Sequence, residues 1–302
     1  MAYKNFNELK DYILKNGKKI NCVVVSAHEE HTILAVIRAY NDSIINPILV
    51  GNKKKIIEIL KDNNFDYKKI EILDAKDDDG SMSIAIEMIK SHRAECIMKG
   101  IIKTDKFMSA LFKKENDLRK SKQVSMLSFR EIPNYHKLLA FTDTGICPHP
   151  TLQQKKDIIQ NSVEIMNKMG IRNPKVAVLA AVEAPNDKMP ESLDGYELKK
   201  MCENGEITEC IVEGPISLDL ALSKEAANIK GYKSEVAGDA DLLLFPDLAS
   251  ANVTTKMIAQ ITQEPAGVLV LGTRVPAIVC SRSATVETKY LCITLAAAGG
   301  LG

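Results

Sequence analysis

The sequence predicts an α/β protein built from two doubly wound domains. Short apolar runs rich in β-branched residues alternate with amphipathic stretches of helical spacing, beginning with Asn21–Ser26 and Glu29–Tyr40. This alternation is typical of parallel sheets that carry helices on both faces. It restarts after residue 139, and the last run, Val268–Cys280, is apolar enough for a strand buried on both faces.

The first half of the chain supplies strands separated by helices. Each expected helix places apolar residues three and four apart, as Ile33, Val36 and Ile37 do in the first one. The expected strands are Asn21–Ser26, Pro47–Gly51, Ile70–Leu73 and Cys96–Met98. The helices between them are Glu29–Tyr40, a lysine-rich segment ending at Lys61, and Ser81–Ser91.

The second half repeats the pattern. A long helix, Lys155–Met169, is closed by Gly170, and a final helix covers Val286–Ala298. The expected strands are Leu138–Thr142, Lys175–Val182, Glu209–Gly214, Ala240–Phe245 and Val268–Cys280, the last broken by a Gly-Thr-Arg-Val-Pro link. Because we expect the final helix to return to the first domain, that domain is predicted to comprise residues 1–137 plus 283–302. The second is predicted to comprise 138–282.

Composition excludes several classes of function. The 302 residues are 45% hydrophobic and 26% charged, and the net charge of +1 gives no field that favours nucleic acid or membrane. The polar start lacks a signal-peptide core, and no run of eighteen apolar residues occurs, so we expect a cytoplasmic protein. Seven dispersed cysteines without a CxxC pair suit a reducing compartment. Five histidines without zinc spacing predict no metal site.

The common phosphate cradles and hydrolase motifs are absent from the sequence. It has no GxGxxG, no GxxxxGK[ST] and no GxSxG. The candidate catalytic and binding residues are therefore polar residues that follow the predicted strands, because open α/β sheets bind their ligands at that position.

Ser281-Arg282-Ser283 follows the last predicted strand. The Arg282 guanidinium is a planar fork of donors suited to phosphate oxygens, and the Ser281 hydroxyl can donate to or accept from a reacting atom. The alternative is a helix cap with a solvated neighbour.

Two further loops carry polar groups after strands. In the loop after Met98, Gly100 would let the backbone approach an anion, and Lys99 and Thr104 would meet phosphate oxygens. The alternative is a tight turn with exposed lysines. Asp143, in the second loop, is interpreted either as a functional carboxylate or as a turn residue.

Two more segments complete the candidates. In Glu213–Asp219 a Gly-Pro pair turns the chain sharply, and Ser217 or Asp219 is expected to cap a helix through Glu225. Asn252 and Lys256 are four residues apart, hence on one helical face, and would reach a single ligand.

Taken in order, these segments resemble the phosphate acetyl/butyryltransferases, and most closely the butyryl branch. The resemblance spans nearly the whole chain and rests on Pro47–Gly51, Met98–Thr104, Asn173–Glu183, Glu213–Asp219, Ala237–Asp241, Phe245–Asp247, Asn252 with Lys256, and Val275–Ser283.

The resemblance implies a reversible reaction, in which acyl-CoA and inorganic phosphate give acyl phosphate and free CoA. It also implies two α/β domains with the site in the cleft between them, similar to isocitrate and isopropylmalate dehydrogenases, and a homo-oligomer, dimeric or larger. Coenzyme A is a substrate, and no permanently bound cofactor is expected. Ser281 would contact the CoA sulfur and Arg282 would handle the phosphate charge.

The sequence departs from the acetyltransferase branch at one position. That branch has an aspartate, proposed as the base, seven residues after the serine, where this chain has Thr288. Glu287 would substitute as a catalytic carboxylate, or it is a first-turn residue favoured by the helix dipole. The departure favours the butyryl branch and leaves the base open.

Competing interpretations are a phosphate acetyltransferase and a non-catalytic protein that binds CoA or acyl phosphate. The joint presence of Ser281, Arg282, Asn252 and Lys256 weighs against the second. A decarboxylating dehydrogenase would share the expected fold, but the sequence lacks the metal-binding aspartates and the arginine-rich loop that such an enzyme needs.

Overall fold

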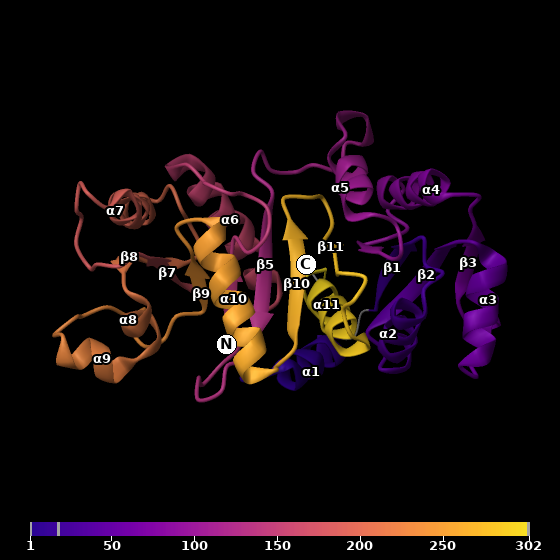
Figure 1. Ribbon diagram of the computed structural model, residues 1–302, viewed down its shortest axis with the longest axis horizontal. Coiled ribbons are helices and arrows are strands. Elements are labelled where there is room, and N and C mark those ends of the chain that lie inside the picture. Colours follow the sequence, from indigo (N-terminus) through magenta and orange to yellow (C-terminus); the bar gives the residue numbers. More distant parts are fainter. Residues whose placement is uncertain (1, 17–18, 301–302) are drawn as a thin grey trace. The chain divides into compact units, whose positions relative to one another are not determined.

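The computed structural model describes residues 2–16 and 19–300 and confirms the α/β class (Figure 1). These residues form two compact units. The terminal unit comprises Asn7–Lys120 and the segment from Pro265 onward, and the central unit comprises Ser121–Glu264 and the N-terminal residues up to Phe6. The division of the chain after residues 137 and 282 stays a prediction.

The terminal unit contains strands in the order β3-β2-β1-β4-β11-β10. Neighbouring strands run parallel from β3 to β11, whereas β10 and β11 are antiparallel. Its elements are α1 (Phe6–Asn16), β1 (Ile20–Val25), α2 (Glu30–Asn41), β2 (Ile45–Gly51), α3 (Lys53–Asp62), η1 (Tyr67–Lys69), β3 (Glu71–Asp74), α4 (Asp78–Lys90), β4 (Cys96–Lys99), α5 (Thr104–Phe112), η2 (Lys114–Asn116), β10 (Ala266–Leu271), β11 (Ala277–Ile278) and α11 (Val286–Gly299).

The prediction of one strand over Val268–Cys280 is wrong. The chain reverses between β10 and β11, so that Val270 pairs with Ala277 in antiparallel register. Gly272 has φ 92°, a backbone conformation that favours glycine, and it begins the reversal. β11 then runs parallel to β4, so the residues after β11 still lie at the carboxyl edge of the parallel strands.

The C-terminal helix α11 forms part of the core of the terminal unit. It packs against α2 and β10 (Figure 1). Every residue from Lys289 to Gly299 is buried, as expected of a helix that is apolar on all sides. Thr285 caps its N-terminus by accepting the Thr288 N–H at 3.2 Å.

The central unit has its own hydrophobic core. Its strands lie in the order β5-β6-β9-β7-β8, antiparallel between β5 and β6 and parallel elsewhere. Phe141 and Phe245 stack at 6.1 Å between ring centroids within this core. Its elements are β5 (Ser125–Arg130), β6 (Leu139–Thr142), α6 (Leu152–Lys168), β7 (Lys175–Leu179), α7 (Pro190–Glu203), β8 (Ile211–Ile216), α8 (Leu218–Leu222), α9 (Lys224–Ile229), β9 (Leu242–Leu244) and α10 (Leu248–Thr262).

The other predicted strands and helices are confirmed, with bounds shifted by a few residues. The expected helix through Glu225 is instead two helices, α8 and α9, which meet at Ser223. Ser217 precedes α8 without a side-chain cap, because its hydroxyl donates to Glu183 at 2.5 Å. Within the part of the chain that the structure describes, no helix has both the length and the apolar character needed to cross a membrane.

Candidate active site

The carboxyl ends of β1, β4 and β11 meet at one edge of the terminal unit. Val25 pairs with Lys99, and Ile278 pairs with Met98, so these three strands end at the same level. Ser281 and Arg282 follow β11 after a two-residue connection. The structure therefore brings the predicted residues Lys99, Gly100, Ser281 and Arg282 to a single strand edge.

Gly100 lies where the end of β4 crosses the segment after β1. Its N–H donates to the Val25 carbonyl at 2.8 Å, and the next N–H, of Ile101, donates to the Ser26 carbonyl at 3.0 Å. A Cβ at position 100 would lie 2.4 Å from the Ser26 carbonyl oxygen and 2.6 Å from that of Val25. Glycine is required here by close approach of the protein's own backbone, which favours the tight-turn alternative for this residue.

Lys99 is buried beneath this edge with 2% of its surface exposed. Its Nζ donates to the carbonyl oxygens of Gly100 and Ile102, each at 3.1 Å. Burial lowers the pKa of this ammonium, and the neighbouring Arg282 guanidinium lowers it further. Within the described residues no carboxylate lies within ion-pair distance of Lys99.

Ser281 and Arg282 are exposed in the segment between β11 and α11. The Ser281 Oγ lies 2.9 Å from the Ser283 Oγ and accepts the Ser283 N–H at 3.3 Å. The Arg282 guanidinium has no hydrogen-bond or ion-pair partner in residues 2–16 and 19–300. An unpaired guanidinium next to a buried ammonium forms an electrostatic setting suited to an anion.

Thr104 begins α5, directly after the Gly100 loop. The residue before it, Lys103, stands at the N-cap but provides no side-chain cap. The first N–H groups of α5 therefore lack a capping side chain. Thr104 and Lys103 are both exposed, as the sequence-based interpretation of this loop requires.

Glu287 lies in the first turn of α11, and its carboxylate forms an ion pair with Arg38 of α2. The Arg38 guanidinium also lies over the Tyr290 ring, 3.8 Å from the centroid. These contacts hold Glu287 against α2. They favour the first-turn alternative over a role as the catalytic base.

The sequence analysis did not identify Lys289, which is 3% exposed and lies near Lys99. Its Nζ donates to Glu29 at 2.6 Å and to Thr32 at 3.0 Å. Burial would raise the pKa of Glu29, but hydrogen bonds from Lys289 and Thr32 lower it to about 2. A single lysine at the start of an apolar C-terminal helix was the signal in the sequence that could have identified it.

Ser26, which directly follows β1, and His28, two residues later, also lie at this edge. The Ser26 hydroxyl donates to Asp78, in the first turn of α4, at 2.6 Å. His28 Nδ1 is buried without a hydrogen-bond partner among the described residues, and burial lowers the pKa of this imidazole. Their position after a buried strand was the available signal.

Asp143 lies in the central unit, at the end of β6, and is 3% exposed. Its two carboxylate oxygens accept four backbone N–H groups, from Met126 at 2.9 Å, Gly145 at 3.1 Å, Ile146 at 3.2 Å and Cys147 at 2.7 Å. Burial raises the pKa of Asp143, and these N–H groups oppose that effect. The contacts favour the turn-residue alternative.

Asn252 and Lys256 lie one turn apart on α10 of the central unit. The Asn252 side chain is half-buried and that of Lys256 is exposed. Neither side chain has a hydrogen-bond partner among the residues described. Both are thus available to a ligand, as their spacing predicts.

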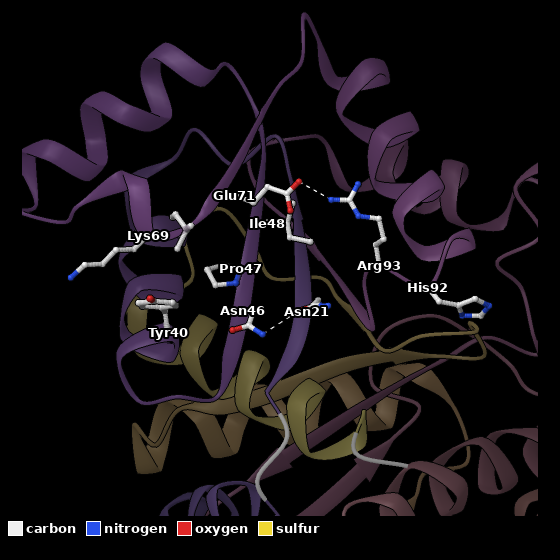
Figure 2. A pocket seen from close by; sticks show the side chains of 10 residues that line it. Asn21, Tyr40, Asn46, Pro47, Ile48, Lys69, Glu71, His92 and Arg93 are labelled. Carbon is white, nitrogen blue, oxygen red and sulfur yellow. Dashed lines mark hydrogen bonds and ion pairs between the residues drawn. The ribbon is translucent and has the colours of Figure 1, made fainter.

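Figure 2 shows a separate pocket of the terminal unit, at the opposite, amino ends of its strands. It measures about 420 Å³ and contains an Arg93–Glu71 ion pair of 2.8 Å. Its lining residues are Asn21, Tyr40, Asn46, Pro47, Ile48, Lys69, Ile70, Glu71, His92 and Arg93. None of the predicted site residues lines it. Over the described ranges, no group of three or more His, Cys, Asp or Glu side chains could hold a metal ion.

Comparison with known proteins places these residues in a family. A sequence model described as phosphate acetyl/butaryl transferase matches residues 78–297. A phosphate acetyltransferase of Thermotoga maritima is 36% identical over 94% of this chain and 96% of its own length. A phosphate butyryltransferase of Clostridium acetobutylicum is 37% identical over 97% of both chains.

The fold agrees with that of a solved relative. The structure of a branched-chain phosphotransacylase from Enterococcus faecalis V583 matches with a TM-score of 0.81 and 26% identity, covering 93% of this chain and 99% of that one. The resemblance inferred from sequence motifs is thus confirmed, while the likeness to isocitrate and isopropylmalate dehydrogenases stays a prediction. The chain belongs to the phosphate acetyl/butaryl transferase family, and it is an acyltransferase.

Proposed function

We propose that the protein transfers a short acyl group, preferentially butyryl, reversibly between coenzyme A and inorganic phosphate. The observation that carries this proposal is the position of Arg282, an exposed guanidinium without a partner among the described residues, beside Ser281 and the buried Lys99. Guanidinium forks and ammonium groups are the usual protein partners of phosphate oxygens. Membership of the family supports acyl transfer as the reaction.

The proposed reaction gives Arg282 and Ser281 separate roles. When a phosphate oxygen attacks the thioester carbonyl, the carbonyl oxygen becomes an oxyanion next to the phosphate charge, and the CoA sulfur leaves as a thiolate. Arg282 stabilises the phosphate and the developing charge, an effect worth about 3–4 kcal/mol for one fixed donor group. Ser281 donates its hydroxyl proton toward the departing sulfur and takes up the proton that the attacking phosphate releases.

In the reverse direction the CoA thiol must lose a proton before it attacks the acyl phosphate. A free thiol has a pKa of about 8.5, so a base or a hydroxyl relay is needed near the sulfur. Ser281 lies at the strand edge, whereas the Glu287 carboxylate is held by Arg38. We therefore assign the relay to Ser281 rather than to Glu287: its hydroxyl takes up the thiol proton and passes its own proton to an oxygen of the departing phosphate.

Three further residues are proposed as substrate contacts. Thr104 is exposed at the start of α5, where no side chain caps the helix. Asn252 and Lys256 present a side-chain amide and an ammonium without partners among the described residues. The acyl phosphate and the CoA phosphates are the anionic groups that such side chains recognise. Gly100 and Asp143 would shape the loops on which these contacts depend.

The preference for butyryl rests on Thr288. The aspartate of the acetyltransferase branch would stand at this position, but the Thr288 side chain is a hydroxyl, which accepts the hydroxyl proton of the capping Thr285 at 3.2 Å and cannot act as a carboxylate base. Phosphate acetyltransferase activity is the second candidate. The relative named phosphate acetyltransferase is 36% identical and the one named phosphate butyryltransferase is 37% identical, so identity does not separate them.

The test uses the purified full-length chain. Butyryl-CoA is mixed with inorganic phosphate, and free CoA thiol is measured over time. Phosphate-dependent release is expected, whereas a non-catalytic binding protein would release none. A panel of thioesters with acyl chains of about two to six carbons, compared by kcat/KM, then tests the butyryl preference, since one methylene is worth only about 1–3 kcal/mol. A higher kcat/KM for acetyl-CoA would establish the acetyltransferase alternative.

A further inference from the structure

Two cysteines lie in contact directly beside the proposed site. The sulfur atoms of Cys280 and Cys292 are 3.3 Å apart within the terminal unit. Cys280 immediately precedes Ser281 and Arg282, and Cys292 lies in the middle of α11. Cys280 is 7% exposed and Cys292 is fully buried.

The two thiols have different environments. The contact with Cys292 lowers the pKa of Cys280, and the ammonium groups of Lys289 and Lys99 favour its thiolate in addition. The same contact and complete burial raise the pKa of Cys292, whose sulfur also accepts the Val268 N–H at 3.2 Å. Cys280 is therefore the more nucleophilic and the more accessible of the two.

We propose that Cys280 is an oxidisable thiol with Cys292 as its resolving partner, and that a hydroperoxide converts the pair into an intramolecular disulfide beside Ser281. The Cys280 thiolate attacks one peroxide oxygen, the O–O bond breaks, and the other oxygen leaves with a proton as water. The Cys292 sulfur then attacks the Cys280 sulfenic acid, the S–O bond breaks, and a second water leaves with the thiol proton. Overall, two thiols and one hydrogen peroxide give one disulfide and two waters.

The disulfide would change the geometry of the site. The two sulfur atoms must approach from 3.3 Å to a bond length of about 2.0 Å. Cys292 is fixed within a buried helix, whereas Cys280 lies in the connection between β11 and α11, which has no regular structure. The connection therefore moves, and Ser281 and Arg282 move with it. This consequence for activity rests on the proposed function, but formation of the disulfide does not.

Disulfide mapping tests the site without any assay of activity. The native full-length chain is treated with hydrogen peroxide, the remaining thiols are alkylated under denaturing conditions, and the unreduced protein is digested with trypsin. Trypsin cleaves after Arg282 and Lys289, so Cys280 and Cys292 fall in different peptides. The expected product is a Cys280–Cys292 linked pair that is lost on reduction. Recovery of both cysteines as alkylated thiols after peroxide treatment would overturn the proposal.

Matched variants separate the two roles. Cys292→Ser is expected to abolish the linked pair and to leave Cys280 as a sulfenic acid that reacts with dimedone. Cys147→Ser removes another buried cysteine and is expected to leave the linked pair unchanged. Absence of dimedone labelling at Cys280 in Cys292→Ser would contradict the assignment of Cys280 as the thiol that is oxidised first.

Activity gives a separate readout. If the proposal holds, peroxide abolishes phosphate-dependent loss of the thioester in the wild-type chain, and a dithiol reductant restores it. Activity that survives complete formation of the disulfide would contradict the claim that the disulfide displaces Ser281 and Arg282. A chain that forms the disulfide but never shows acyl transfer would instead contradict the proposed function and leave the thiol pair established.

Discussion

Lys289 of α11 places its ammonium 2.6 Å from the carboxylate of Glu29, which caps the N-terminus of α2. The two residues are 260 positions apart in the sequence, and Lys289 is 3% exposed. Glu29 also accepts the N–H groups of His31 and Thr32, each at 2.9 Å. One carboxylate thus caps α2 and neutralises a cation of the C-terminal helix.

The variant Glu29→Gln is expected to lower the free energy of unfolding by about 3 kcal/mol, because it leaves the buried Lys289 ammonium without a counter-ion. Lys289→Met should cost less, since Glu29 would keep its backbone hydrogen bonds and partial exposure. The double variant should recover part of the loss of Glu29→Gln. Urea denaturation of the three variants measures these differences. Equal stability of Glu29→Gln and the wild-type chain would contradict the account of this ion pair.

The same pair predicts a dependence of stability on pH. The folded-state pKa of Glu29 is about 2, below its ordinary value of 4.5, so the unfolded chain binds its proton first as the pH falls. The stabilisation from Glu29 is complete above about pH 4.5 and is lost progressively toward pH 2. The difference in unfolding free energy between the wild-type chain and Glu29→Gln should shrink over this range. A difference in unfolding free energy that stays constant over this pH range would show that the loss of stability in Glu29→Gln does not arise from the Glu29 charge.

Gly100→Ala is expected to destabilise the terminal unit and to reduce activity. The added Cβ would lie 2.4 Å from the Ser26 carbonyl oxygen, so the backbone must shift, at a cost of about 1–3 kcal/mol. Thermal unfolding measures the effect. Gly80→Ala is the control, because its Cβ would meet nothing closer than 3.4 Å. Equal unfolding temperatures for the two variants would contradict the close-approach argument.

Lys99→Met is expected to raise the KM for phosphate about tenfold, equivalent to about 1.4 kcal/mol, with a smaller change in the KM for butyryl-CoA. The variant removes the buried ammonium that adjoins Arg282 and keeps a side chain of similar length. Lys68→Met removes an exposed charge near the opposite, amino end of β3 and is the control. Initial-rate kinetics with each substrate varied in turn measure both constants. An equal rise in the two KM values would contradict a specific contribution of Lys99 to phosphate binding.

Ser281→Ala is expected to lower kcat more than Glu287→Gln does. Ser281 supplies the hydroxyl at the strand edge, whereas the Glu287 carboxylate is engaged by Arg38. Turnover numbers for the two variants, each checked for folding by circular dichroism, provide the comparison. The reverse order would identify Glu287 as the base.

Periodicity in the sequence predicted most of the sheet. Buried strands such as β1 and β4 are continuous β-branched or apolar runs, and Ser281-Arg282 was placed correctly after the last of them. The reversal at Gly272 was missed because the two apolar runs that flank it read as one strand. The Gly-Thr-Arg-Val-Pro link interrupts the hydrophobic run, but an interruption of this kind fits an irregularity within one strand as well as an antiparallel reversal, and only the structure shows Gly272 at positive φ.

Several features of the site depend on contacts that no local pattern reports. The ion pair between Lys289 and Glu29 joins two helices from opposite ends of the chain. The reason for Gly100 lies in the backbone of Ser26, more than seventy positions earlier. Glu287 was ambiguous in the sequence because its partner, Arg38, lies on another helix. The Lys289–Glu29 and Glu287–Arg38 pairs follow from the packing of α11 on α2, and the Gly100–Ser26 contact follows from the pairing of β1 with β4.

The most direct test of the central claim is phosphate-dependent release of CoA from butyryl-CoA by the wild-type chain, Arg282→Ala and Arg172→Ala. Arg172 is an exposed arginine of the central unit, so its loss matches the change in charge. We predict that Arg282→Ala lowers turnover by at least about a hundredfold while Arg172→Ala retains wild-type turnover. Equal turnover in Arg282→Ala and Arg172→Ala would contradict the claim that the guanidinium beside Ser281 handles phosphate.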